Sequence, residues 1–580
     1  MVRVRLIGLA VALVFLAVRP AMADEAATKR CSALIGGRFV DLPSAPTWVI
    51  NAIHHEATPT TRAYCEIEGY VNPTVNFGLA LPSEGWNGKY MVRGCGGSCG
   101  HVVLEGACGK HLRDGYACLH TDMGHHSDQI DNNWVANNLQ GLVDFGYRAT
   151  HVTTVAGKAI VAAYYQSAAK KSYFYACSTG GRQAMIEAQR FPLDFDGIVG
   201  VAPVNISGFG YALDYAAPTA MNTGADGQAI LPDIKVPVVY KAVIAQCDAN
   251  DGVRDGLVDP RDCKFDPASV QCKTGDAADC LTAAQVDMVR KFYARGAAVG
   301  SELNWINNWT RKPGPAVEFA QSRGDPAVIE TLNNAGNPDL RAFHAHGGKL
   351  ILAHGMTDLI VPPARTFDYY ELATHTMGGL TETQKFFRYF VIPGMDHCSG
   401  GDGAWGVNYV GAIERWVEKG EAPDKLVGVH PKLGVALDYF GVDADLLKPD
   451  EIAFSRPYFP YPLRAYYSGR GDPNSAASFS AGLKPLGRMA ANPEKMAAVD
   501  ADHLAAELSV LIAATEQAYL ASGLPPKNVT DRIGKAVRRK IYTTTASTAV
   551  IAAAIKKVGA SKLSDIARDA IDLVKPEFPG

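Results

Sequence analysis

Several features that would direct this sequence toward particular classes of protein are missing from it. Charge of neither sign predominates, since 56 lysines and arginines oppose 59 aspartates and glutamates. Surfaces that bind nucleic acid or anionic membranes are usually basic, so we expect no nucleic-acid or membrane partner. No internal repeat is present. A small molecule is the expected partner, and the oligomeric state is left open.

Long hydrophobic runs are also scarce. The apolar stretch from Leu6 to Val18 is shorter than the ~20 residues that a membrane-spanning helix needs. It follows a basic start and precedes Ala21-Met22-Ala23, which is the layout of a secretory signal peptide. A membrane anchor is the alternative. We expect residues 1–23 to be a signal peptide and the mature protein, starting at Asp24, to be secreted or periplasmic.

The cysteines lack the spacing of metal ligands. Twelve are present, but no Cys-x-x-Cys pair or His-x3-His spacing accompanies them, so a zinc site is not indicated. An oxidising compartment allows this many cysteines to pair, whereas a reduced cytosol would leave exposed thiols. The composition therefore predicts a set of disulfides in an exported protein.

The sequence does contain a recurring alternation of strand and helix patterns. Between Tyr90 and Ser178, short β-rich runs alternate with longer helical ones, which predicts βαβ units and a largely parallel sheet. The pattern resumes at residues 347–363 and 386–401, and irregular sequence with cysteines separates the two parts. We predict an α/β core in two parts, residues 24–204 and 346–481, with a lid inserted at 205–345.

The last segment, residues 482–580, is rich in alanine and is predicted to be a helical C-terminal extension. No site motif supports an independent binding module there. Its apolar residues recur at helical spacing. They are Leu504, Leu508, Leu511, Ile512 and Tyr519.

One tight turn is suited to nucleophilic catalysis. The window Ala176-Cys177-Ser178-Thr179-Gly180 joins a predicted strand to a predicted helix, and small residues flank its serine. Such an elbow projects the serine hydroxyl toward a substrate carbonyl. The window departs from Gly-x-Ser-x-Gly by Ala176, and small-x-Ser-x-Gly is common by chance. The flanking strand and helix patterns favour the catalytic interpretation.

A catalytic serine needs a histidine base and an acid that orients it. The chain order Ser, Asp, His of α/β-hydrolases is met by Ser178, Asp358 and His397, each placed just past a predicted strand. A turn or helix-capping role is the alternative for Asp358. His354 and Asp396 are competing candidates near these positions.

Cys177 directly precedes the serine, and Cys398 directly follows the histidine. If Ser178 and His397 meet at hydrogen-bond distance, the two cysteines come within disulfide range as well. The expected bridge would hold the base near the nucleophile. A thiolate nucleophile at Cys177 is the rival interpretation, but an exported thiol with a placed partner is expected to oxidise.

Together the segments CSTGGRQ, GMTDLIVPP and MDHCSGG resemble the tannase and feruloyl esterase family, and the resemblance spans about Cys31 to Ala481. It implies an α/β-hydrolase fold with an inserted lid, acting on esters of aromatic carboxylic acids. It also implies Ser178, Asp358 and His397 as the triad. The bridges that it implies are Cys177–Cys398, Cys247–Cys263, Cys272–Cys280 and Cys31–Cys65.

The resemblance further implies a structural calcium site in the lid, and no organic cofactor is expected. Composition alone is equally consistent with a solvated acidic turn. Carboxylates crowded into one short turn repel one another unless a cation lies between them. The implied ligands are the side chains of Asp248, Asp251 and Asp255 and the backbone oxygens of Val253 and Leu257.

An ester hydrolase also needs two backbone N–H donors for the oxyanion. Thr179 is expected to supply one, and Gly96 or Gly97 in the segment RGCGGSCG the other, unless this segment is an ordinary glycine turn. The nearby Cys95, Cys99, Cys108 and Cys118 allow three pairings. A disulfide that the family often has near its C-terminus is absent, because Phe459 and Ala481 occupy those positions.

The favoured function is thus a secreted serine esterase of the feruloyl esterase or tannase type. A hydrolase of the mono(2-hydroxyethyl) terephthalate type is the alternative within the family, and a calcium-stabilised, non-catalytic binding protein is the alternative outside it. Trp305, Trp309, Phe319 and Arg323 in the lid could contact an aromatic acid or could equally form the core of the lid.

Overall fold

The computed structural model describes residues 25–204, 217–432, 447–483, 500–520 and 548–575, apart from 38, 129–130, 132, 307 and 311–330, and also the single residues 530, 533 and 537. The described residues form two compact units. One lies within residues 1–366 and 377–486, and the other within 367–376 and 487–580. The predicted signal peptide, Phe319 and Arg323 lie outside the described residues. In the described part of the chain, no helix is both long and apolar enough to cross a bilayer.

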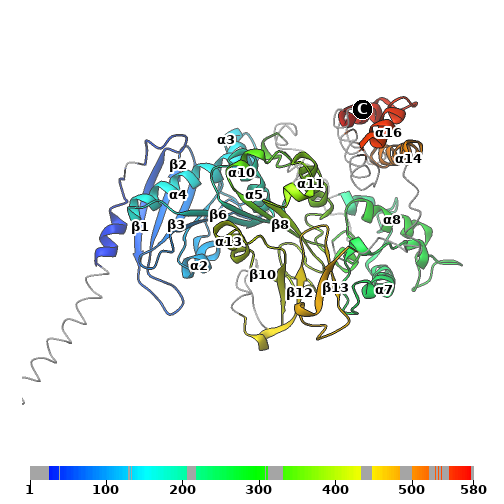
Figure 1. Ribbon diagram of the computed structural model, residues 1–580, viewed down its shortest axis with the longest axis horizontal. Coiled ribbons are helices and arrows are strands. Elements are labelled where there is room, and N and C mark those ends of the chain that lie inside the picture. Colours follow the sequence, from blue (N-terminus) through cyan, green and yellow to red (C-terminus); the bar gives the residue numbers. More distant parts are fainter. Residues whose placement is uncertain are drawn as a thin grey trace, which may run out of the picture. The chain divides into compact units, whose positions relative to one another are not determined.

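The first unit is built on a nine-stranded mixed sheet (Figure 1). Its spatial order is β1-β2-β3-β5-β4-β6-β7-β8-β9. The pairs from β1 to β5 are antiparallel, and the pairs from β5 to β9 are parallel. The strands are β1 (Thr47–His55), β2 (Tyr64–Val71), β3 (Val75–Pro82), β4 (Lys89–Arg93), β5 (Ala117–Thr121), β6 (Lys171–Cys177), β7 (Gly197–Val201), β8 (Lys349–Gly355) and β9 (Phe387–Ile392).

Helices cover both faces of this sheet, as two layers around a parallel sheet require. Helices α2 (Leu104–Arg113) and α13 (Tyr409–Lys419) share one core with alternate strand residues such as Tyr173 and Val199. Helices α4 (Ala149–Tyr165) and α5 (Thr179–Arg190) pack on the other face, where Gly157 lies against Leu119 and Gly200 against Ala184. Shorter helices of the first unit are α3 (Leu139–Val143), α10 (Arg341–Ala345) and α12 (Leu380–Thr383), whereas most of α11 (Ala364–Thr376) belongs to the second unit.

This arrangement confirms the α/β-hydrolase prediction. The strands were predictable because they are short apolar runs that are buried on both faces, as in β7, where every residue is buried. Parallel strands with intervening helices place all their carboxyl ends at one edge of the sheet. The loops after β4, β6, β8 and β9 therefore meet at this edge, which is where the sequence placed its candidate residues.

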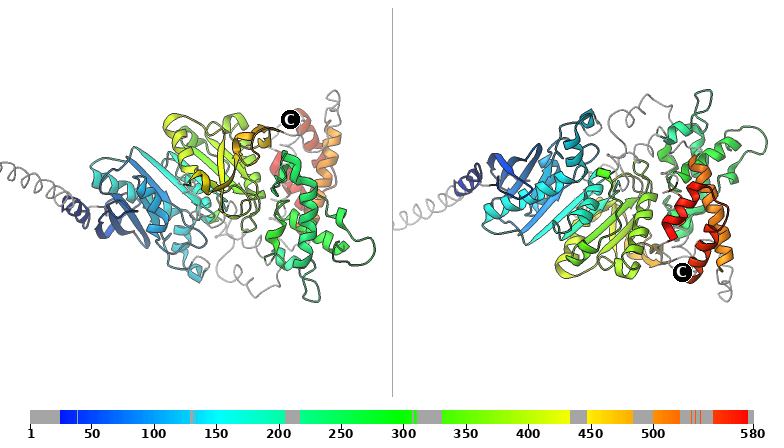
Figure 2. Two further views of the ribbon diagram at one scale, coloured as in Figure 1. Left: turned by 90° about the horizontal axis from the view of Figure 1, so that it is seen from below. Right: turned by 90° about the horizontal axis from the view of Figure 1, so that it is seen from above.

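The described residues within 217–346 follow β7 and differ in character, because they hold short helices and turns and contribute no strand to the main sheet (Figure 2). The longer helices are α7 (Val236–Cys247) and α8 (Ala283–Ala294). Trp305 and Trp309 are 0% and 1% exposed, and both rings pack edge-on against Phe292. These two tryptophans form the core of this segment, so the expectation that they could contact substrate is not supported.

Two small sheets complete the first unit. They contain β10 (Gly406–Val407), β11 (Leu426–Pro431) and β12 (Ile452–Tyr458), and β13 (Arg464–Tyr467) and β14 (Phe479–Gly482).

The second unit contains the C-terminal helices α14 (Ala501–Leu520), α16 (Thr548–Gly559) and α17 (Asp565–Val574). The apolar spacing read from the sequence marks the buried side of α14, since Leu504, Leu508 and Ile512 are buried. Leu511 is only partly buried.

Candidate active site

Ser178 lies on a sharp turn between β6 and α5. Its backbone adopts φ 63° and ψ −122°, a left-handed conformation that a non-glycine residue rarely adopts. The Ser178 amide donates to the carbonyl of Val201 at 3.0 Å, which ties the turn to the end of the neighbouring strand. Positive φ at a serine between a strand and a helix is the geometry of a nucleophile elbow.

The departure at Ala176 from the usual glycine has a steric explanation. A Cβ on Gly94 would lie 2.7 Å from the Ala176 methyl group, and one on Gly180 would lie 2.4 Å from it. Both distances are too short for real carbon contacts. The alanine is therefore accommodated because its two neighbours have no side chain.

The three candidate triad residues form one hydrogen-bonded chain. The Ser178 Oγ is 2.9 Å from His397 Nε2, and His397 Nδ1 is 2.7 Å from Asp358 Oδ2. Because an ionised carboxylate can only accept, Nδ1 carries the proton and Nε2 is left to accept from the serine hydroxyl. This is the tautomer that a general base requires.

Asp358 is fully buried and has four donors. Its Oδ1 accepts from the amides of Ile360 and Val361 at 2.8 and 2.9 Å. Its Oδ2 accepts from both His397 and His354. Burial alone would raise the pKa of Asp358, but the charge of His397 and the hydrogen bonds of the two histidines outweigh burial and hold the pKa well below its usual value. The carboxylate thus remains ionised.

The competing candidates occupy supporting positions. His354 is fully buried, with Nε2 3.2 Å from Asp358 Oδ2 and 2.8 Å from the Val361 carbonyl, while Nδ1 is 2.7 Å from the Thr366 hydroxyl. Asp396 Oδ1 accepts from the Thr357 hydroxyl and the Asn304 amide. Burial raises the pKa of Asp396. Neither residue forms a hydrogen bond with Ser178 among the described residues.

Cys177 and Cys398 form a disulfide with their Cα atoms 5.8 Å apart. It joins the elbow to the histidine loop across 221 residues of sequence, and both cysteines are buried. All twelve cysteines are paired. The bridges Cys31–Cys65, Cys247–Cys263 and Cys272–Cys280 are present as the resemblance implied, and the open cluster resolves into Cys95–Cys99 and Cys108–Cys118.

The expected oxyanion donors lie on adjoining segments. Thr179 is the first residue of α5, where amides have no acceptor within the helix. Its hydroxyl donates to the carbonyl of Gly97 at 2.7 Å, which places the glycine segment beside the start of the helix. A helix N-terminus next to the nucleophile favours developing negative charge.

The acidic turn of the insertion is closed by the Cys247–Cys263 bridge. Asp248 Oδ1 accepts from the amides of Asp255 and Gly256, and Asp251 Oδ1 from that of Val253. Asp255 also pairs with Arg456 at 2.5 Å. Among the described residues, no three His, Cys, Asp or Glu side chains converge closely enough to form a metal cluster.

Burial raises the pKa of Asp251 to about 7, and the charges of Asp255 and Asp248 raise it as well. The carboxylates of the turn therefore repel one another, although they do not converge on a common point in this structure. Carboxylate and backbone oxygens are the donors that calcium uses.

Comparison with known proteins identifies the chain. The family model described as "Tannase and feruloyl esterase" matches residues 59–314 and 316–481. The chain belongs to the tannase and feruloyl esterase family. Members of this family hydrolyse carboxylic esters, and the protein is a carboxylic ester hydrolase.

Individual members of the tannase and feruloyl esterase family agree with this assignment. The chain is 31% identical to a mono(2-hydroxyethyl) terephthalate hydrolase of Piscinibacter sakaiensis, over 76% of this chain and 90% of the relative. It is 30% identical to a probable feruloyl esterase of Arthroderma benhamiae, over 70% of this chain and 82% of that relative. The crystal structure of feruloyl esterase B from Aspergillus oryzae superposes with a TM-score of 0.67 at 25% identity, covering 79% of this chain and all of that one.

Sequence reasoning missed two features of this site. The role of His354 as a donor to Asp358 was not foreseen, although its position four residues before the aspartate could have suggested it. The Cys95–Cys99 bridge was one of three open pairings, and its signal was the Cys-x3-Cys spacing around two glycines.

Proposed function

We propose that the protein hydrolyses esters of aromatic carboxylic acids through an acyl-enzyme formed on Ser178. The observation that carries the proposal is the continuous hydrogen-bonded chain from the Ser178 hydroxyl through His397 to the buried Asp358 carboxylate. The aromatic acid class is supported by family membership and by the relatives named as feruloyl esterases.

The geometry supports a two-step reaction. As Ser178 Oγ bonds to the ester carbonyl carbon, its proton passes to His397 Nε2, and Asp358 stabilises the imidazolium that forms. The amides of Thr179 and of Gly96 or Gly97 would stabilise the charge on the carbonyl oxygen. His397 then protonates the departing alcohol, which leaves an acyl-serine. Water, deprotonated by His397, attacks the acyl carbon and releases the acid and the free serine.

Substitution of the nucleophile tests this mechanism. Ser178→Ala should lower kcat by about 10⁴-fold or more for chlorogenate, methyl gallate and a terephthalate monoester. Ser480→Ala, at an exposed serine on β14, is the control and should match the unmodified enzyme. Equal turnover by Ser178→Ala and the unmodified enzyme would reject the serine mechanism, and absence of turnover by both would favour a non-catalytic binding protein.

A terephthalate monoester is the second candidate substrate. The 31% identity with the mono(2-hydroxyethyl) terephthalate hydrolase of Piscinibacter sakaiensis favours it. Specificity is a ratio of kcat/KM values, so these values for chlorogenate, methyl gallate and a terephthalate monoester show which class of ester the enzyme prefers. A kcat/KM highest for the terephthalate monoester would support this second candidate over the feruloyl esterase and tannase types.

We also propose that calcium binds the acidic turn through Asp248, Asp251 and Asp255, with the carbonyl oxygens of Val253 and Leu257. Burial and the charges of Asp255 and Asp248 raise the pKa of Asp251, and a bound cation would relieve this repulsion, which supports the proposal. The role would be structural. Metal analysis of the purified protein and of Asp251→Ala tests it, and absence of bound calcium from both would refute it.

We further propose that the protein is exported and that residues 1–23 are removed. Six disulfides and no free cysteine suit an oxidising compartment, and this supports cleavage of residues 1–23. Mass spectrometry of the secreted protein should find Asp24 at the N-terminus. An intact N-terminus on protein recovered from the medium or periplasm would contradict the cleavage.

A further inference from the structure

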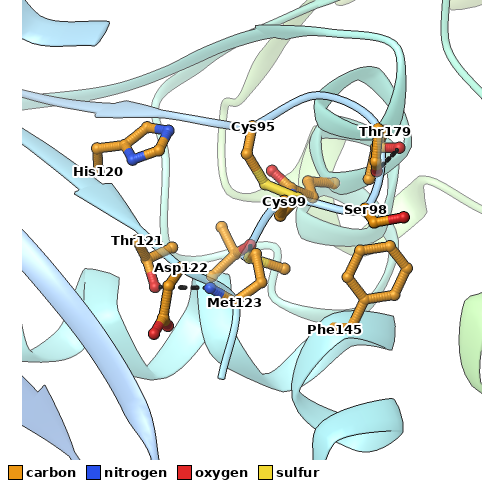
Figure 3. The surroundings of a disulfide bond; sticks show 12 residues. Cys95, Ser98, Cys99, His120, Thr121, Asp122, Met123, Phe145 and Thr179 are labelled. Carbon is orange, nitrogen blue, oxygen red and sulfur yellow. Dashed lines mark hydrogen bonds between the residues drawn. A yellow bond between two sulfur atoms is a disulfide. The ribbon is translucent and has the colours of Figure 1, made fainter. Parts of the chain in front are cut away.

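A short disulfide-closed loop follows β4 at the edge of the sheet where Ser178 lies. We call residues 94–100 the oxyanion loop. Cys95 and Cys99 are bonded across only four positions, with Cα atoms 5.4 Å apart, and they are 8% and 3% exposed. Figure 3 shows the bridge closing the loop, with Thr179 on one side and Asp122 and Met123 on the other. Both candidate oxyanion glycines lie between the bridged cysteines.

The helix that carries the nucleophile contacts this loop. The Thr179 hydroxyl donates to the Gly97 carbonyl at 2.7 Å (Figure 3), and the Gln183 side-chain amide lies 3.1 Å from the Cys95 sulfur. A Cβ on Gly180 would lie 2.9 Å from the Cys95 carbonyl oxygen, so loop and helix backbone are nearly in contact. Movement of the loop would therefore change its distance from Ser178 directly.

The opposite side of the oxyanion loop is held by the segment after β5. The His125 Nε2 lies 2.7 Å from the Ser98 carbonyl, and the Gly100 amide donates to the Asp122 carbonyl at 3.2 Å. The His125 ring stacks on Trp134 with centroids 3.6 Å apart. These contacts hold the C-terminal side of the loop, at Ser98 and Gly100, and do not involve the amides of Gly96 or Gly97.

The glycines themselves leave the middle of the loop conformationally permissive. Gly97, Cys99 and Gly100 all have positive φ, of 57°, 60° and 91°. Glycine has many accessible conformers, and a non-glycine residue resists positive φ. Without a crosslink, these residues could rotate their amides away from the substrate oxygen. A ring closed by a disulfide removes most of those conformers.

We propose that the Cys95–Cys99 disulfide is a positioning element for the esterase reaction. Together with the Thr179 hydroxyl it holds the segment of Gly96 and Gly97 beside Ser178, so that one of these two amides faces the developing oxyanion. The proposal rests on the serine mechanism described above. It predicts that loss of the bridge weakens transition-state stabilisation while ground-state binding is retained, since the oxyanion forms only during reaction.

The test is the double variant Cys95→Ala/Cys99→Ala, which removes the bridge and leaves no stray thiol. A donor misplaced by about 1 Å can cost about 10²-fold in rate, so we expect kcat to fall about 10- to 100-fold with KM within about threefold. Affinity for an aryl boronic acid, which mimics the tetrahedral intermediate, should fall by a similar factor. The control is Cys272→Ala/Cys280→Ala, which removes another local bridge, in the insertion, and should leave both values unchanged.

Covalent labelling by a phosphonate separates this test from that of the mechanism. The folded double variant should still be modified at Ser178, because nucleophile and base are untouched. Unchanged kcat and boronic acid affinity in a folded double variant would overturn the positioning role while leaving the serine mechanism intact. If the phosphonate does not label Ser178 in the unmodified enzyme, the serine mechanism itself is rejected.

A second pair of variants applies if the double variant does not fold. Thr179→Val keeps the shape of the side chain but removes the hydroxyl that holds Gly97, whereas Thr179→Ser keeps that hydroxyl. We expect kcat to be several-fold lower in the valine variant than in the serine variant, which keeps the hydroxyl. Equal kcat in the two variants would overturn the proposal.

Discussion

Two aspartates of this protein have pKa values that are shifted in opposite directions, although burial acts on both of them. Asp358, after β8, is surrounded by donors, namely two backbone amides and two histidines, and its pKa is held well below the usual value. Asp251, in the acidic turn, has a donor at Val253 but faces Asp255 and Asp248, and its pKa is raised to about 7.

The difference shows that burial does not by itself decide whether a carboxyl group is charged. Burial disfavours the charged form at both sites, and the neighbours determine the net direction. At Asp358 the chain supplies all the compensating groups, so the site is complete without an added ion. At Asp251 the neighbouring carboxylates add negative charge, and the Val253 amide and Arg456, which pairs with Asp255, offset part of it. The first arrangement suits catalysis, and the second is where we propose that calcium binds.

The largest expected effect comes from removing the charge at the first of these sites. Asp358→Asn should lower kcat about 10⁴-fold, because the amide no longer orients His397 or stabilises its charged form. Steady-state hydrolysis of methyl gallate measures it. Asp396→Asn is the matched control, since this nearby carboxylate is hydrogen-bonded to Thr357 and Asn304 instead. A larger loss in the control than in Asp358→Asn would contradict the assignment.

Removal of one donor from Asp358 should have an intermediate effect. His354→Phe deletes the N–H that reaches Asp358 Oδ2 and should lower kcat about 10- to 100-fold, because the carboxylate loses part of its alignment. His354→Gln retains an N–H donor and should lose less. Kinetics of both variants, with thermal unfolding as a check on folding, measure the effect. Identical kcat in the two folded variants would show that the donor has no positioning role.

The second site should respond to metal instead of to substrate. A chelator should lower the unfolding temperature of the unmodified protein by several degrees, because a ligand at about 100 times its Kd stabilises the folded state by about 2.7 kcal/mol. Differential scanning calorimetry with and without calcium measures it. Asp251→Ala should show no response to the chelator. An equal response in both proteins would place the effect elsewhere.

The smallest expected effect is a pH dependence of calcium affinity. Because the metal-free folded protein holds a proton on Asp251 up to about pH 7, calcium must displace that proton below this value. Affinity should therefore fall as pH decreases from 8 to 6. In the metal-free protein, the same group favours the folded state less as pH rises from about 4 to about 7. Calorimetric titration with calcium at several pH values measures the binding, and a constant affinity would contradict it.

Much of the site was predictable because its signals are local. The elbow window, the chain order Ser178, Asp358 and His397, and the cysteines adjoining two of these residues are all visible in the linear sequence. The Cys177–Cys398 bridge was expected because a hydrogen bond between neighbours constrains the residues next to them. The four-residue spacing between His354 and Asp358 allowed a contact, but the sequence did not show that the turn after β8 folds back so that the two side chains meet.

The lid residues mark another limit of prediction from sequence. Trp305 and Trp309 had two interpretations, and their burial against Phe292 supports the packing role. An aromatic side chain in an irregular segment carries no periodicity that would show which way it points. The burial of Trp305 and Trp309 depends on their packing against Phe292 of α8, which is a tertiary contact.

The sequence by itself determined the fold class, the chemical class of the enzyme and a short set of candidate reacting groups, because strand periodicity, local motifs and residues at strand ends are visible along the chain. Only the tertiary structure decided which of the four clustered cysteines pair, which histidine faces Ser178, and how the oxyanion loop lies against the nucleophile's helix. These depend on distances between segments that are separated in the chain, and such distances are set by packing across the sheet.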